Sequence, residues 1–222
     1  VRLLPYTLLA AFLPGAFWIW YFHRRDRFDR EPLPMLLKAF GCGALAVIPA
    51  LAFEYPFRGF LQGELGLGAA LWLSFGVVGF GEELVKLLAV YLAVYHSQHF
   101  DEPVDGIMYA VTVGMGFSVV ENVLYISAFG LEIAPLRASV ASLAHASFSG
   151  ISGYFLGKGK FLGSPFSHAV QGLFWAAVLH GAYDFILITQ VISPLFVIAL
   201  VAILHYVLLR LLARLLTQSP FR

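Results

Sequence analysis

The segment that decides the fold covers residues 69–95 and reads AALWLSFGVVGFGEELVKLLAVYLAVY. It is long enough to cross a bilayer as a helix, which takes about 20 mostly apolar residues. Its middle nevertheless holds Glu82, Glu83 and Lys86. A charged side chain at the centre of a membrane helix costs roughly 2.5–3.5 kcal/mol on insertion scales and commonly marks a functional site. The segment therefore predicts a membrane helix that contributes to a polar site.

The composition of the whole chain agrees with a membrane location. The 222 residues are 60% hydrophobic and 12% charged, with a mean hydropathy of +0.82. Soluble proteins average about 25% charged residues. The net charge of +1 and the absence of a basic patch give no indication of a nucleic-acid partner. We expect an integral membrane protein with the lipid bilayer as its surroundings and a single domain over residues 1–222.

The apolar segments predict an all-α polytopic membrane protein with about seven transmembrane helices. A polar site is expected between the third and the sixth of them, because each of these four carries ionisable side chains. The predicted spans cover residues 3–22, 33–54, 69–95, 105–129, 138–157, 166–190 and 192–216.

The distribution of lysine and arginine predicts the orientation. Cytoplasmic loops carry an excess of basic residues. With seven spans, the amino terminus outside and the carboxyl terminus inside, this rule holds for most of the chain. The basic residues then on the cytoplasmic side are Arg24, Arg25, Arg27, Arg30, Lys158, Lys160, Arg210, Arg214 and Arg222, and those on the outer side are Arg2, Arg58 and Arg137.

The acids and the lysine of the third predicted span have helical spacing. Glu83 and Lys86 are i,i+3 neighbours and Glu82 and Lys86 are i,i+4 neighbours, so the lysine can reach either carboxylate. One acid can be neutralised in this way, and the other remains available as a general base. A structural salt bridge between Glu83 and Lys86 is the alternative, and it leaves Glu82 unexplained.

The fourth predicted span holds Phe117-Ser118-Val119-Val120-Glu121-Asn122. Glu121 lies one helical turn beyond Phe117 and one turn before Tyr125. A second helix thus contributes a membrane-embedded carboxylate to the polar site. The alternative is a buried structural glutamate that is hydrogen-bonded to a neighbouring hydroxyl.

The fifth and sixth predicted spans contribute imidazoles. His145 lies on a stripe with serines at helical spacing, whereas His180 and Asp184 are i,i+4 neighbours. A carboxylate at this spacing can orient an imidazole and stabilise its cation. Counted from the outer ends of their spans, Glu121, His145 and Asp184 lie in the outer half of the membrane. The remaining histidines are expected to be bystanders: His96, His99, His168 and His205.

These motifs together resemble the PrsW family of bacterial intramembrane proteases. The resemblance rests on Glu-Glu-x-x-Lys at 82–86, Phe-x-x-x-Glu-Asn at 117–122, His145 and His-x-x-x-Asp at 180–184. The wider superfamily contains the CAAX prenyl endopeptidases, bacteriocin-processing proteins and the gamma-secretase scaffold subunit. CAAX enzymes typically have Phe-x-x-x-His where this chain has Glu121, so no role for Glu121 follows from them.

The resemblance implies an intramembrane endopeptidase of the bacterial cytoplasmic (inner) membrane. Its expected substrate is a single-span membrane protein, in the way that members of the family cleave anti-sigma factors. The cleaved bond is expected near the extracytoplasmic surface, which agrees with the outer position of Glu121, His145 and Asp184.

A mechanism follows as a hypothesis. Glu82, helped by Glu121 or His145, would activate a water molecule. His180 would stabilise the tetrahedral oxyanion or protonate the leaving amine. Asp184, which would hold His180, and Glu83, which would set the charge balance around Glu82, are expected to belong to the catalytic set. Lys86, Phe117 and Asn122 are expected to support it.

The donor set also admits a metal. Glu82, Glu121, His145 and His180 could ligate zinc, which lowers the pKa of bound water. The chain has no His-Glu-x-x-His, and its candidate ligands come singly from different helices. The sequence therefore favours a metal-free glutamate protease with no cofactor, and a zinc metalloprotease is the alternative.

Three rival functions remain open at the level of sequence. Gly150-Ile151-Ser152-Gly153 matches the Gly-x-Ser-Gly of rhomboid serine proteases, with His180 as base, but leaves the acids unexplained. A transporter or proton relay also uses membrane-embedded carboxylates and histidines. A non-catalytic scaffold of the same fold has little need of uncompensated carboxylates.

Overall fold

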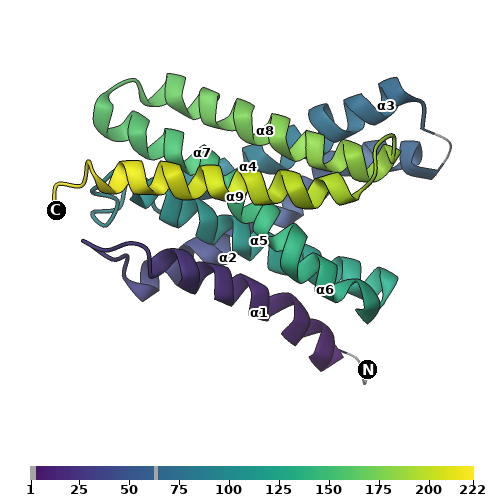
Figure 1. Ribbon diagram of the computed structural model, residues 1–222, viewed down its shortest axis with the longest axis horizontal. Coiled ribbons are helices and arrows are strands. Elements are labelled where there is room, and N and C mark those ends of the chain that lie inside the picture. Colours follow the sequence, from purple (N-terminus) through teal and green to yellow (C-terminus); the bar gives the residue numbers. More distant parts are fainter. Residues whose placement is uncertain (1–3, 63–64) are drawn as a thin grey trace.

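The fold was established from a computed structural model, which describes residues 4–62 and 65–222 (Figure 1). Within these ranges the regular structure is entirely helical and contains no strand. The predicted all-α class is therefore confirmed. Arg2 and Leu3, which the sequence analysis used for orientation and for the first span, lie outside the described residues.

Seven helical rods account for most of the described chain. Three rods contain short π-helical or 3₁₀ segments, and each of these joins its neighbour without a break in the helical backbone. The elements are α1 (Leu4–His23), α2 (Leu33–Glu54) with the 3₁₀ helix η1 (Tyr55–Gln62), α3 (Leu67–Leu71), the π-helix η2 (Trp72–Gly79), α4 (Phe80–Ala93), α5 (Asp105–Phe129), the 3₁₀ helix η3 (Leu131–Ile133), α6 (Ala134–Leu136), the π-helix η4 (Arg137–Ala141), α7 (Ser142–Leu162), α8 (Pro165–Thr189) and α9 (Leu195–Leu216).

Five helices are long and apolar enough to cross a membrane by themselves. They are α1, α2 extended to Gly59, α5, α8 and α9. The third and fifth predicted spans correspond to the rods α3–η2–α4 and α6–η4–α7, in which π-helical segments interrupt the α-helix. The exact count of seven membrane spans stays a prediction.

Helix α5 forms the centre of the bundle. Of its most apolar window, 72% is buried within the protein, against 17–33% for the other four candidate spans. It packs against α2 on one side and α7 on the other, and α4 packs against α2 and α8. Figure 1 shows α1 and α8 at opposite edges of the bundle, with α5 between them. The faces of α4, α5, α7 and α8 that carry the ionisable side chains are therefore surrounded by other helices.

Small residues allow α5 and α7 to approach closely. A Cβ atom on Gly153 would lie 2.1 Å from the carbonyl oxygen of Gly106, so the backbones of the two helices are in direct contact there. Gly153, the last residue of the Gly-x-Ser-Gly match, is therefore a packing residue. Gly79 has the same function between η2 and α8, because its Cβ would lie 2.7 Å from the carbonyl oxygen of Ala177.

Candidate active site

Four helices bring ionisable side chains to one place in the bundle. Helix α4 contributes two acids and a lysine, and α5 contributes one acid. Helix α7 contributes one imidazole, and α8 contributes an imidazole and an acid. Five of these side chains are buried, with exposed fractions of 5% or less: Glu82, Glu83, Lys86, His145 and His180. The structure thus assembles the polar cluster that the sequence predicted for the third to sixth spans.

Lys86 lies at the centre of the cluster. Its Nζ atom donates to Glu82 Oε2 at 3.0 Å, to Glu83 Oε1 at 2.8 Å and to His145 Nδ1 at 3.0 Å. It also lies 4.2 Å from the centroid of the Phe117 ring. Three acceptors use all three protons of an ammonium group. Lys86 therefore fixes both acids of α4 and one nitrogen of His145.

The bond to Lys86 determines the tautomer of His145. An ammonium group can only donate, so Nδ1 must accept and Nε2 carries the ring proton. That Nε2 lies 2.7 Å from Glu121 Oε2. Glu121 also receives a 2.7 Å bond from Arg137 Nη2, while Arg137 Nε donates to Asn122 Oδ1 at 2.8 Å. Two donors thus hold the Glu121 carboxylate in a defined position.

His180 is oriented by Glu83, which differs from the role that the sequence suggested for Asp184. The Nδ1 atom of His180 lies 3.0 Å from Glu83 Oε1, and its ring stacks on Phe148 with centroids 4.9 Å apart. Asp184 Oδ2 lies 3.4 Å from Nε2 and has no hydrogen-bond partner among the described residues. Asp184 therefore faces the Nε2 atom of the imidazole, and Glu83 holds the Nδ1 atom.

A cavity of about 490 Å³ adjoins the cluster. Its polar lining includes Glu82, Glu121, His145, His180 and Asp184, whereas its remaining lining is mainly aliphatic and aromatic. Glu83 and Lys86 lie behind this layer and do not line the cavity. The site therefore has a front layer that can meet water and substrate, and a rear layer that orients it.

Two side chains of the site were missed by the sequence analysis. Arg137, in the π-helix η4, was assigned only to the outer loop, yet it binds Glu121 and Asn122 and lines the cavity. Glu54, at the end of α2, also lines the cavity. Both residues lie at predicted outer ends of spans, toward the same side of the membrane as Glu121. That shared side was the available signal.

The histidines expected to be bystanders lie outside the cavity lining. His205 is 3.1 Å from the hydroxyl of Tyr21, and His168 contacts the carbonyl oxygen of Ser164. Within the described ranges, no hydrogen bond joins Ser152 to His180, and the Ser152 hydroxyl has no partner. The geometry thus gives no support to a rhomboid-like serine and histidine pair.

The cluster also contains a donor set that fits a metal ion. Glu82, His145 and His180 each offer one ligand atom, and these atoms lie within 4.8 Å of one another. Two imidazoles and one glutamate form a common set of protein ligands for catalytic zinc. The ammonium group of Lys86 lies in the same space, 3.0 Å from Glu82 Oε2, and neutralises part of the negative charge.

Comparisons with known proteins agree with these motifs. Residues 31–211 match the family described as PrsW family intramembrane metalloprotease. The chain is 36% identical to the Protease PrsW of Bacillus subtilis (strain 168) over 80% of this chain and 81% of the relative. It is 37% identical to the Protease PrsW of Geobacillus kaustophilus (strain HTA426) over 82% and 79%, respectively.

A third relative, the Protease PrsW of Clostridioides difficile (strain 630), is 35% identical over 82% of this chain and 79% of the relative. No solved structure shows a significant match. The family match covers every residue of the polar cluster, and the apolar helices that hold this cluster are long enough to cross a bilayer. The chain is therefore an integral membrane protein that belongs to the PrsW family of intramembrane proteases.

Proposed function

We propose that the protein hydrolyses a peptide bond in a single-span, membrane-anchored protein, with a glutamate-activated water as nucleophile. The observation that supports this proposal is the joint exposure of two glutamates and two imidazoles to one cavity of about 490 Å³. An anti-sigma-factor-like protein is the proposed substrate. Peptide hydrolysis needs a base for water, a donor for the oxyanion and an acid for the leaving amine, and the cavity offers a candidate for each.

Glu82 is the proposed general base. It lines the cavity, and its one hydrogen bond among the described residues comes from Lys86. Glu121 is bound more tightly, because Arg137 and His145 both contact its Oε2 atom at 2.7 Å. A carboxylate held by two donors has fewer oxygen lone pairs free to meet a water molecule. Glu82 would take a proton from water while the water oxygen bonds to the carbonyl carbon.

The imidazoles supply the remaining steps. His180 Nε2 lies between Asp184 Oδ2 at 3.4 Å and Glu82 Oε2 at 3.9 Å, where it can relay the proton from Glu82 to the leaving amine. Once it carries that proton, His180 Nε2 is also the proposed donor for the oxyanion, because the Nε2 proton of His145 is already bonded to Glu121 and Arg137 is bonded to Glu121 and Asn122. Collapse of the tetrahedral species then breaks the carbon–nitrogen bond and releases a carboxylate and an amine.

A zinc-dependent form of the same hydrolysis is the second candidate, supported by the approach of Glu82, His145 and His180 within 4.8 Å. These three residues would hold the ion. A bound zinc ion would polarise the substrate carbonyl and acidify a water molecule. Glu121, which lies directly beside His145, would then act as the general base. This form requires the ring nitrogen of His145 that binds the ion to give up its present partner, which is Lys86 at Nδ1 or Glu121 at Nε2.

Measurement of zinc per mole of active protein, before and after treatment with a chelator, separates the two forms. A glutamate protease retains full cleavage activity in metal-free buffer. Stoichiometric zinc whose removal abolishes cleavage, and whose return restores it, would establish the metal-dependent form instead.

A cleavage assay in proteoliposomes tests the proposal as a whole. Single-span peptides are presented to Glu82→Gln, Glu121→Gln, His145→Ala and His180→Ala variants, with Glu132→Gln and His168→Ala as matched controls outside the cavity. We expect the four site variants to lose cleavage and the two controls to retain it. Comparable cleavage by all variants would contradict the proposal, and loss of ion flux in the site variants would indicate a transporter.

The proposed orientation has the amino terminus outside and the carboxyl terminus inside the bacterial inner membrane. It is supported by the concentration of arginines between α1 and α2 and near the end of α9. With this orientation the Glu121 end of α5 lies toward the outer face. Reporter fusions at the two termini, active on opposite sides of the membrane, check it.

A further inference from the structure

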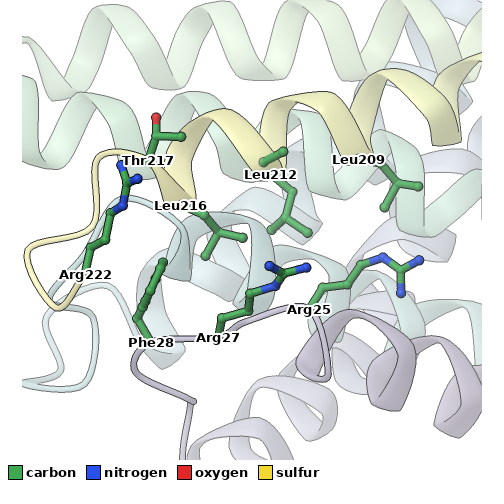
Figure 2. A pocket seen from close by; sticks show the side chains of 9 residues that line it. Arg25, Arg27, Phe28, Leu209, Leu212, Leu216, Thr217 and Arg222 are labelled. Atoms are coloured by element: carbon green, nitrogen blue, oxygen red, sulfur yellow. The ribbon is translucent and has the colours of Figure 1, made fainter.

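A groove of about 350 Å³ lies at the end of α9, remote from the candidate active site. It runs between the last turns of α9 and the segment that joins α1 to α2, and Figure 2 shows its side chains. It shares no lining residue with the cavity of the polar cluster. The groove therefore needs an explanation of its own.

One part of the groove is cationic. Arg25, Arg27 and Arg222 line it, and in Figure 2 the guanidinium of Arg27 points into the space beneath Leu212. Among the described residues, no carboxylate lies within ion-pair distance of these three arginines, although Asp26 and Asp29 are neighbours in the chain. Three guanidinium groups without acidic partners favour an anionic ligand.

The other part of the groove is apolar. Leu209, Leu212, Ala213 and Leu216 line it along one face of α9, together with Phe28. A soluble anion gains no free energy by contact with such a surface, whereas the acyl chain of a lipid is stabilised when it buries apolar area there. The groove thus presents charge and apolar surface side by side, which matches an amphiphile.

The groove is also placed where a lipid headgroup would lie. Helix α9 is a candidate membrane span that ends at Leu216, so the groove adjoins the end of an apolar helix. At the neighbouring end of α1, Arg24 lies 5.7 Å from the centroid of the Trp20 ring and Arg25 lies 3.6 Å from that of Tyr21. Tryptophan, tyrosine and arginine near span ends are typical of the membrane–water interface.

We propose that this groove binds an anionic phospholipid, with its negatively charged headgroup on the side lined by the arginines and the first part of an acyl chain along the leucines of α9. Basic pockets between membrane helices are known to take anionic headgroups. A bound lipid would connect the α1–α2 segment to the end of α9. This site does not depend on the function proposed for the polar cluster.

Native mass spectrometry of the full chain in detergent tests the proposal. Phosphatidylglycerol and phosphatidylcholine with identical acyl chains are added separately, and inorganic phosphate is added as a competitor. We expect phosphatidylglycerol to bind more tightly by about tenfold or more, because only its headgroup carries a net negative charge, and phosphate at low millimolar concentration to leave it bound.

Two sets of variants make the test specific. Arg27→Gln with Arg222→Gln should weaken phosphatidylglycerol binding by about fivefold per arginine. The matched pair Arg210→Gln with Arg214→Gln removes the same charge from exposed positions of α9 outside the groove, and should leave binding nearly unchanged. Ala213→Trp should weaken binding without a change of charge, because the indole would fill the apolar part of the groove.

Three results would overturn the proposal. Equal binding of the two lipids by the unmodified protein would remove the role of the headgroup charge. Equal weakening by the two arginine pairs would indicate general attraction to the basic surface. Displacement of phosphatidylglycerol by inorganic phosphate alone would indicate a soluble anion as the ligand.

Discussion

At the scale of single residues, Lys86 holds more of the site than any other side chain. It is 1% exposed and binds Glu82, Glu83 and His145 at once. A buried charge that loses its only compensation is costly, whereas a fully satisfied network is stable. The protein therefore keeps two acids of one helix inside the bundle because one ammonium group bridges them.

Removal of this ammonium group should destabilise the protein. Lys86→Met leaves Glu82 and Glu83 without their common donor, and we expect a loss of about 3–5 kcal/mol of stability together with loss of cleavage. Thermal unfolding in detergent measures the first effect. The double variant Lys86→Met with Glu83→Gln removes one of the two stranded charges and should recover part of the stability. An unchanged unfolding temperature in the single variant would show that Lys86 is not the main compensating charge.

Arg137 is proposed as a positioning residue, because it holds the side chains of Glu121 and Asn122. Its two bonds, to Glu121 at 2.7 Å and Asn122 at 2.8 Å, have the fork geometry of a guanidinium group. Arg137→Gln should lower kcat by about 10²-fold with little change in KM, because a displaced catalytic group costs rate. Arg137→Lys keeps the charge without the fork and should recover only part of the rate.

Arg58→Gln is the matched control for Arg137, since Arg58 is an exposed arginine on the same predicted side of the membrane. It should cleave at the unmodified rate. Full activity in Arg137→Lys would mean that charge alone suffices, and would contradict a role for the geometry of the guanidinium.

At the scale of elements, π-helical segments directly precede two of the helices that carry the site, α4 and α7. The π-helix η2 leads directly into α4, which carries the acids, and η4 contains Arg137 and leads into α7, which carries His145. A π-helical turn changes which face the following residues present, and such turns are frequent at functional sites. Helical spacing within one segment was readable in the sequence, whereas these changes of helical phase were not.

The contact of η2 with α8 sets the distance between Glu83 and His180. Gly79→Ala should separate these elements, because the added Cβ would lie 2.7 Å from the carbonyl oxygen of Ala177 and 2.8 Å from the amide nitrogen of Gly181, and backbone atoms yield little. We expect a loss of about 1–3 kcal/mol of stability, measured by thermal unfolding, and reduced cleavage.

Gly68→Ala serves as the control for Gly79→Ala. It lies in the same helical rod, and a Cβ at this position would meet nothing within 4 Å. We expect unchanged cleavage and equal or slightly higher stability. Equal effects of the two substitutions would contradict the importance of the contact between η2 and α8.

At the scale of the whole molecule, a group of buried acids lies at the opposite end of α5 from Glu121. Asp26 in the α1–α2 segment is 0% exposed, and both oxygens of its carboxylate lack a hydrogen-bond partner among the described residues. Burial, together with the nearby Glu102 and Asp29, raises the pKa of Asp26 from 3.8 to about 7 against the lowering effect of Arg30. The carboxyl group is thus held largely in its protonated form below neutral pH.

This shift predicts that acidification stabilises the protein. Because the pKa in the folded protein exceeds the ordinary value of 3.8, the folded state binds the proton more tightly than the unfolded state. The resulting stabilisation is fully present below about pH 4 and is lost as the pH rises through about 7. The temperature at the midpoint of thermal unfolding in detergent should therefore decrease when the pH is raised from 5 to 8.

Asp26→Asn should flatten part of this pH dependence, since an amide does not titrate. Asp29→Asn removes only a lesser contribution to the shift, so it should reduce the slope less than Asp26→Asn does. An unfolding midpoint that rises from pH 5 to pH 8 in the unmodified protein, with the same slope in Asp26→Asn, would contradict the assignment.

The helices themselves were largely predictable from the sequence. The fourth predicted span, 105–129, coincides with α5, and the second, 33–54, with α2. The fifth was predicted as 138–157, whereas its helical rod continues to Leu162 and begins with α6 at Ala134. Hydropathy locates the apolar middle of a helix, but it does not detect the polar or glycine-rich turns at either end.

The sequence by itself determined that the chain enters a membrane, where its helices lie and which polar residues they carry, because hydropathy and helical spacing are local properties. Only the tertiary structure decided which acid faces the cavity and which nitrogen of each histidine is held. Lys86 meets His145 across 59 positions and Glu83 meets His180 across 97. Such contacts depend on how helices far apart in the chain pack together, and no local pattern records that packing.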